Sequence, residues 1–207
     1  MLVPIPAAER SGFAEPADPC QHSLVPDHPL ARALVVVNLV GGLLVLASYA
    51  HGLATHSEVE RAALWGGVPE AWRGIYSLSM LLATLGYFPM AAQLLWRDDP
   101  ATLQLGPFGY GLVIAGFVLV LLPSALWMPL TFRMLAAPSL ALWLGIRVVL
   151  ALVAVGALSL VAALVWAGPR RGGWPHVAAI VGAIAFAWQT AVLDAVLWPA
   201  WFGHLRG

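Results

Sequence analysis

The 207-residue chain has little charge: only 10% of its residues are charged, and its cations are all arginine, with no lysine. An ordinary soluble domain carries about 25% charged residues, so this chain lacks the polar surface that a globule needs in water. The formal net charge is zero, which excludes the basic patch that a nucleic-acid-binding protein uses. We therefore expect no nucleic-acid partner.

Cysteine is almost absent as well. The single Cys20 cannot form an intramolecular disulfide or build a metal site alone, and the chain holds no His-x-x-His or His-Glu-x-x-His motif. Cys20 lies in a polar, proline-rich stretch that lacks the cationic start and apolar core of a signal peptide. We expect residues 1–29 to form a flexible N-terminal tail. We also expect that the protein requires no cofactor.

Apolar residues, in contrast, make up 61% of the chain, and its mean hydropathy is +0.85. A bilayer core about 30 Å thick is crossed by about 20 apolar residues in a helix. Five runs are long enough, and they are continuously apolar rather than alternating as barrel strands are. The predicted spans are 30–53, 74–96, 108–130, 140–166 and 176–202. The sequence thus predicts an all-α, integral, multi-pass membrane protein, with a five-helix domain over residues 30–207 in the lipid bilayer, and its composition suggests a bacterial inner membrane.

Five spans place the termini on opposite sides, here named side A (N-terminal) and side B. The two sides carry equal numbers of nearby arginines, so the positive-inside rule does not orient the protein. The longest connection, residues 54–73 on side B, is either a lid over a site or a solvated connector. Tryptophans at the span ends predict an interfacial aromatic belt: Trp72, Trp96, Trp166, Trp174, Trp198 and Trp201.

Two ionisable residues lie within the predicted spans on the side-B half. Arg147 and Asp194 are roughly 10 Å and 12 Å from side B at about 1.5 Å per residue. Charged groups at such depth are costly and are functional candidates. We expect them to form an ion pair that lowers the desolvation cost of each; the alternative is that Arg147 snorkels to the lipid headgroups.

Polar and aromatic side chains of several spans gather at the same level. Tyr49 and His51 end the first span, Tyr76 opens the second, and Ser124 and Trp127 lie near the end of the third. This convergence favours a small-molecule pocket inside the bundle, although simple helix–helix packing would give the same pattern.

Two motifs carry a resemblance to a known family. The third span ends SALWMPLTF (residues 124–132), and the fifth contains VLDAVLW (residues 192–198). These are similar to the Asn-x-x-Trp-x-Pro-x-x-Phe and Leu-Asn-x-x-x-Trp motifs of the tryptophan-rich sensory protein/translocator protein (TspO/MBR) family. Five spans, a long first loop and abundant tryptophan also agree. Ser124 and Asp194 each stand where the family has asparagine, and the family's first-loop pattern is not recognisable.

The resemblance implies a TspO-like bundle with a pocket for flat apolar molecules, such as the porphyrin protoporphyrin and other tetrapyrroles, which the protein senses or transports, and it implies homodimers. It transfers Trp127, Pro129, Asp194 and Trp198 as cavity residues. Flat ligands stack on indole rings, and Arg147 or Arg133 suits a ligand carboxylate. The candidate ligand-binding residues are Tyr49, His51, Tyr76, Ser124, Trp127, Pro129, Arg147, Asp194 and Trp198.

Other functions compete with this one. A structural or assembly subunit of a membrane complex would need no ligand. A membrane enzyme, less favoured, would use Asp194 or His51 in acid–base chemistry, but His51 and His56 are five residues apart and share a helix face poorly. A channel or ion-coupled transporter is not expected, because we find no ring of charges, no inverted repeat and only one buried acid.

Overall fold

The computed structural model describes residues 28–98, 100, 101, 103, 108–166 and 173–202. It contains five helices long and apolar enough to cross a membrane: Pro29–Thr55, Glu70–Arg97, Gly111–Ala136, Leu140–Trp166 and Trp174–Trp201. This confirms the prediction of an all-helical, multi-pass membrane protein. The predicted tail, including Cys20, lies outside the described residues, except that His28 caps and Pro29 begins the first helix.

Shorter elements divide two of the spans and the first connection. The full order is α1 (Pro29–Thr55), α2 (Glu58–Ala63), α3 (Glu70–Ala92), η1 (Gln93–Arg97), α4 (Gly111–Ala136), α5 (Leu140–Trp166), α6 (Trp174–Ala187), η4 (Trp188–Leu197) and α7 (Trp198–Trp201). Both η segments are π-helical, with backbone bonds five residues apart. The third span, Gly111–Ala136, begins and ends later than the predicted range of 108–130, because the helix continues through Arg133 to Ala136.

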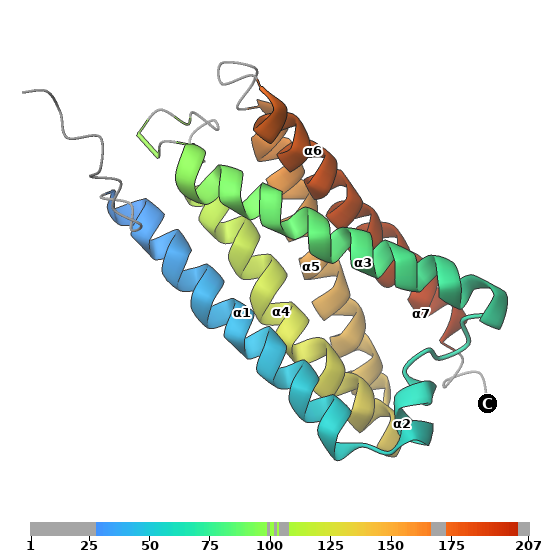
Figure 1. Cartoon of the computed structure of the whole chain (residues 1–207). Coiled ribbons are helices and arrows are strands. Elements are labelled where there is room, and N and C mark those ends of the chain that lie inside the picture. Colours follow the sequence, from blue (N-terminus) through green and yellow to red (C-terminus); the bar gives the residue numbers. More distant parts are fainter. Residues whose placement is uncertain (1–27, 99, 102, 104–107, 167–172, 203–207) are drawn as a thin grey trace, which may run out of the picture.

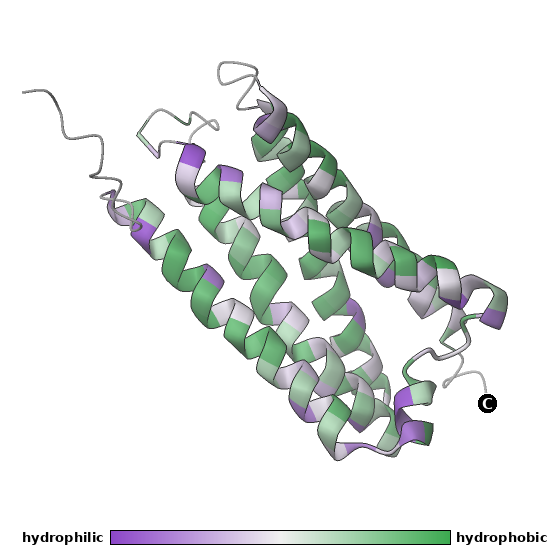
Figure 2. Ribbon diagram, in the orientation of Figure 1, coloured by the Kyte–Doolittle hydropathy of each residue, from purple (hydrophilic) through white to green (hydrophobic). Residues whose placement is uncertain are grey.

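The five spans pack as two helix pairs joined by a fifth helix. α1 lies along α4, α3 lies along α6, and α5 contacts α4, α6 and η4 (Figure 1). Buried side chains form one core with members such as Leu34 and Phe117. A second core lies at side B, around Ile146 and Trp198. The ribbon is hydrophobic over most of each span, and hydrophilic residues are more frequent toward the helix ends (Figure 2). Many large apolar side chains are exposed, such as Leu43, Leu85 and Val155, as a bilayer requires.

Glycine allows two helix pairs to approach backbone to backbone. A Cβ on Gly86 of α3 would lie 2.5 Å from the carbonyl oxygen of Gly182 on α6, and one on Gly156 of α5 would lie 2.7 Å from the carbonyl oxygen of Gly116 on α4. Any larger residue would push these helices apart, so the glycines fix both crossings. Gly145, in contrast, has open space around its Cβ position.

The tryptophans at the span ends divide into two groups. Trp72, Trp96, Trp166 and Trp174 are exposed, as the predicted interfacial belt requires. Trp198 is only 5% exposed, and Trp201 is partly buried and packs against Tyr76. Trp198 and Trp201 lie at the end of their span but face the bundle, where they pack with other rings at side B.

Candidate functional site

Eight aromatic rings gather at the side-B end of the bundle, and we name them the side-B aromatic cluster: Tyr49, Trp65, Tyr76, Trp127, Trp143, Trp198, Trp201 and Phe202. Ring centroids lie 6.1 Å apart for Tyr49 and Trp127, and 5.8 Å apart for Trp127 and Trp198, which meet edge-on. The ring centroids of Trp198 and Phe202 lie 4.5 Å apart. Such separations are those of favourable aromatic pairs. The series joins α1, α4 and α7, which are far apart in sequence.

The first connection closes this cluster on side B. The indole Nε1–H of Trp198 donates to the carbonyl oxygen of Leu64 at 3.0 Å. Gly66 has φ +58° and packs on Phe202, and Gly67 touches the carbonyl of Trp201 so closely that no side chain would fit. Only glycine adopts the positive φ at Gly66 and allows the close backbone approach at Gly67 at a low cost in free energy. The second part of the connection therefore packs on the cluster, whereas α2 has no buried residue; whether the connection acts as a lid stays a prediction.

A short helix, α2, holds the first half of that connection. Ser57 and Glu60 form a capping box, in which the Ser57 side chain accepts from the Glu60 N–H and the Glu60 carboxylate accepts from the Ser57 N–H at 2.8 Å. The Ser57 hydroxyl also donates to the same carboxylate at 2.7 Å. These hydrogen bonds lower the pKa of Glu60 below the ordinary glutamate value.

Asp194 lies behind the cluster, in the π-helical segment η4. Its Oδ1 accepts from Gln189 Nε2 at 2.8 Å. Residues five apart in an α-helix point about 140° away from each other, whereas the i to i+5 bonding of a π-helix brings them into line. The π-helical segment thus holds the Asp194 carboxylate against a side chain of its own span.

The predicted ion pair between Arg147 and Asp194 is not formed within the described residues. Arg147 is exposed on α5, next to the exposed Val148. The inward face of this helix is formed by Ile146 and Leu150, which belong to the side-B core, and this packing rotates Arg147 toward lipid. Its exposure about 10 Å from the helix start fits the alternative in which the side chain snorkels to the headgroups.

Two buried polar atoms near the cluster have no hydrogen-bond partner among the described residues: the Nε1–H donor of Trp127 and the Oε1 acceptor of Gln189. The Gln189 side chain is only 4% exposed. Buried polar atoms are normally paired, and exceptions need an explanation. An unmatched donor and an unmatched acceptor at one end of the bundle suit a ligand that carries both kinds of group.

A separate groove lies in the seam between α1 and α4, also at side B. Its volume is about 270 Å³, and its lining residues are Ser48, His51, Gly52, His56, Pro129, Phe132, Arg133 and Ala136. The His56 ring stacks on Phe132 with centroids 3.6 Å apart. The volume lies just below the range of roughly 300–1,000 Å³ for drug-sized ligands. A tetrapyrrole would not fit in this groove alone.

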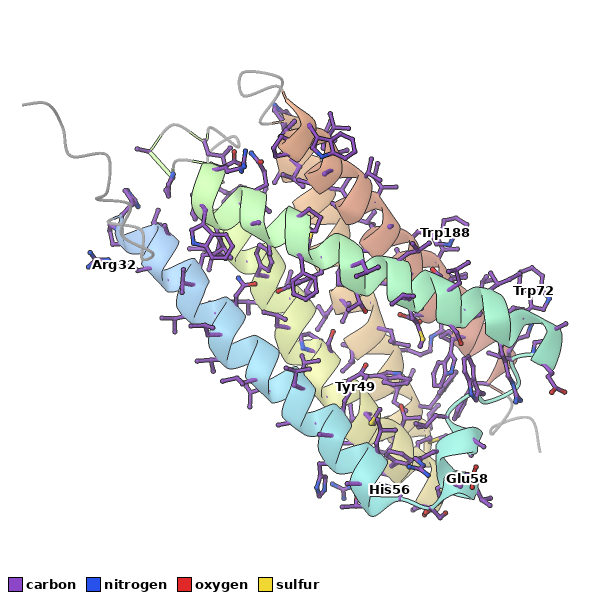
Figure 3. The ribbon with its side chains drawn as sticks, viewed as in Figure 1. Arg32, Tyr49, His56, Glu58, Trp72 and Trp188 are labelled. Carbon is purple, nitrogen blue, oxygen red and sulfur yellow. The ribbon has the colours of Figure 1, made fainter. Side chains whose placement is uncertain are left out.

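The structure divides the nine predicted ligand-binding residues into groups. Tyr49, Tyr76, Trp127 and Trp198 belong to the side-B aromatic cluster, and Asp194 lies beside it. Two others, His51 and Pro129, line the groove instead. Ser124 is partly buried on α4, and Arg147 faces outward. Figure 3 shows Tyr49 directed from α1 toward the bundle interior, whereas Trp72 and Trp188 point outward.

Sequence reasoning missed several contributors, notably Gln189, Trp143 and Phe202. Gln189 had a usable signal, because an amide within an apolar span five residues before an acid is unusual, but the π-helix that aligns the pair is not visible in the sequence. Trp143 and Phe202 stack with centroids 5.3 Å apart, and nothing in the sequence distinguishes them from lipid-facing rings. No group of three potential metal ligands (His, Cys, Asp or Glu) lies together in the described part of the chain.

Comparisons with protein-family models, with curated proteins and with solved structures found no match to this chain. The similarity of the third and fifth spans to TspO/MBR motifs therefore stays a prediction.

Proposed function

We propose that the protein binds a hydrophobic, flat aromatic small molecule, with tetrapyrroles as the model class, at the side-B aromatic cluster within the membrane. The observation that carries the proposal is that closely packed aromatic rings lie near two unsatisfied buried atoms, Trp127 Nε1–H and Gln189 Oε1. Flat ligands gain most from indole faces, and a few placed polar groups then fix their orientation.

The cluster has the parts that such a site needs. Tyr49, Trp127 and Trp198 supply ring surface from three different helices. The lid residue Leu64 is tied to Trp198, so a ligand that displaces Trp198 would also move the lid.

The test is saturable quenching of tryptophan fluorescence by protoporphyrin IX in detergent-purified protein. Trp127→Phe keeps a ring but removes the unsatisfied N–H and most of the stacking face, so its apparent Kd should rise at least about ten-fold, a loss of about 1.4 kcal/mol. Trp188→Phe is the matched control, because Trp188 is 54% exposed and points outward; its Kd should equal that of wild type. Quenching that never saturates, or that changes equally in both variants, removes the proposal.

A further inference from the structure

The groove between α1 and α4 extends from the apolar interior of the membrane to its surface on side B. Pro129 lies seven residues before the end of α4 at Ala136, which is about 10 Å at 1.5 Å per residue. Arg133 lies three residues before that end, or about 5 Å. His56 follows the last residue of α1 directly. The groove thus has an inner end at the depth of acyl chains and an outer end at the level of lipid headgroups.

The inner end of the groove is apolar and opens outward. Gly52 lets α1 approach α4 closely, because a Cβ at this position would collide with the sulfur of Met128 and lie 3.0 Å from the Phe132 ring. Met128 and Phe132 are buried and close the groove toward the bundle. Pro129, in contrast, is exposed. Apolar walls that open on the outer surface of a membrane bundle suit a hydrocarbon chain rather than water.

Arg133 brings an uncommitted charge to the outer end. It is exposed, and its guanidinium has no hydrogen-bond or ion-pair partner among the residues that the structure describes. Other arginines at side B are occupied. Arg61 Nη1 donates to the carbonyl oxygen of Leu53 at 3.0 Å, and Arg73 lies over the Trp65 ring. A guanidinium can bind phosphate with two parallel N–H groups, so Arg133 is available for an anion.

Two histidines line the groove beside Arg133. His56 Nδ1 lies 3.0 Å from the carbonyl oxygen of Gly52, and because a carbonyl only accepts, Nδ1 carries the hydrogen. Nε2 is then the nitrogen left for a ligand, and it donates when the ring is protonated. Stacking on Phe132, with ring centroids 3.6 Å apart, holds the His56 ring in place. His51 is exposed and also lines the groove.

The negative groups near the groove already have hydrogen-bond partners. The C-terminal end of a helix repels anions through its free carbonyls. Three carbonyls near the end of α1 each lie within hydrogen-bond distance of a side chain: those of His51, Gly52 and Leu53, bound by Thr55, His56 and Arg61. Glu60 also acts electrostatically on His56, but its Oε2 accepts hydrogen bonds from the N–H and the hydroxyl of Ser57. The outer end therefore favours an anion.

We propose that this groove binds an anionic phospholipid of the surrounding membrane, with the phosphate at Arg133 and His56 and the start of one acyl chain against Gly52 and Pro129. The volume of about 270 Å³ holds a headgroup and part of one chain, so the rest of the lipid stays in the bilayer. Basic pockets between transmembrane helices bind anionic headgroups in this way. The inference goes beyond the proposed function, because no residue of the side-B aromatic cluster lines the groove.

The test is native mass spectrometry of the detergent-purified protein, titrated with phosphatidylglycerol or with phosphatidylcholine of the same chains. Both lipids carry a phosphate, but choline cancels its charge. We expect a Kd at least about five-fold lower for phosphatidylglycerol. Arg133→Gln should abolish this preference. Arg147→Gln is the matched control: it removes another exposed arginine that does not line the groove, and it should keep the preference.

Three results would overturn the inference. Equal Kd values of the wild-type protein for the two lipids would show only unspecific lipid contact, and equal losses in both arginine variants would show only a general effect of charge. Displacement of bound phosphatidylglycerol by millimolar inorganic phosphate would show a site for free anions. If Arg133→Gln fails to give a monodisperse, helical protein, Ala136→Phe replaces it. This variant fills the groove from an exposed position without changing charge, and wild-type affinity in it would place the lipid elsewhere.

Discussion

The hydroxyl of Tyr76 on α3 donates a hydrogen bond to the carbonyl oxygen of Leu193 in η4 at 2.9 Å. The same carbonyl accepts the backbone N–H of Trp198, so one buried atom joins the second span to the π-helical segment and to the centre of the aromatic cluster. Asp194 follows Leu193 directly. The bond therefore helps to fix the backbone that carries Asp194, and Gln189 Nε2 orients the carboxylate.

Tyr76→Phe should destabilise the fold without disrupting it. Tyr76 is 2% exposed, and loss of its hydroxyl leaves the Leu193 carbonyl with one partner fewer, which costs about 1–2 kcal/mol. Unfolding in a mixed-micelle titration with sodium dodecyl sulfate would measure this change. Ser77→Ala is the control, because the Ser77 hydroxyl bonds only within its own exposed helix turn and its loss should change the free energy of unfolding by less than about 0.5 kcal/mol.

Gly182→Ala should loosen the α3–α6 crossing. The added methyl group would collide with the backbone of Gly86, and backbone cannot move aside as a side chain can, so we expect a loss of more than about 2 kcal/mol. Gly145→Ala meets nothing within 4 Å and should be neutral or stabilising by up to about 1 kcal/mol, since alanine favours the helix. Equal effects of both substitutions on the unfolding midpoint would contradict the close crossing.

The hydroxyl of Ser48 replaces a missing backbone donor in α4. Pro129 has no N–H to offer the carbonyl of Ala125, and Ser48 Oγ donates to that oxygen at 2.7 Å. Ser48→Ala should therefore cost about 1–3 kcal/mol. In the double variant with Pro129→Ala, the restored N–H can pair with the Ala125 carbonyl, so the cost of Ser48→Ala should shrink. An additive double-mutant cycle would show that the two residues do not share this carbonyl.

The capping box of α2 predicts a specific titration. Because hydrogen bonds from Ser57 lower the pKa of Glu60, the cap is fully formed above the unfolded-state pKa of that glutamate and weakens as pH falls through the lower folded-state value. Carboxyl ¹³C shifts in detergent should report the depressed pKa. Ser57→Ala should move it back up toward the ordinary value, and Glu58, which takes no part in the box, serves as the internal reference; no movement of Glu60 would contradict the cap.

The sequence was sufficient to predict the five spans, because the length of an apolar run reports directly on bilayer thickness. It also proposed Trp127, Asp194 and Trp198 as cavity residues from the resemblance to TspO/MBR motifs; Trp127 and Trp198 lie in the side-B aromatic cluster, and their role in binding stays a prediction. The sequence did not predict that the Arg147 side chain faces outward. The direction of a side chain depends on how the helix is rotated, which is set by the packing of neighbours such as Ile146 and not by depth in the membrane. The sequence also did not predict the contact between Gln189 and Asp194. In an α-helix, residues five positions apart lie on different faces, and only the π-helical register brings these two together.

The central claim, that a flat aromatic ligand binds among the side-B rings, is tested most directly by ¹⁹F NMR of protein labelled with 5-fluorotryptophan, assigned by single Trp→Phe variants. On titration with protoporphyrin IX, the resonances of Trp127 and Trp198 should shift together and saturate, while those of Trp188 and Trp96, which are 54% and 62% exposed, stay in place. Shifts confined to the exposed tryptophans, or spread evenly over all of them, would contradict the account.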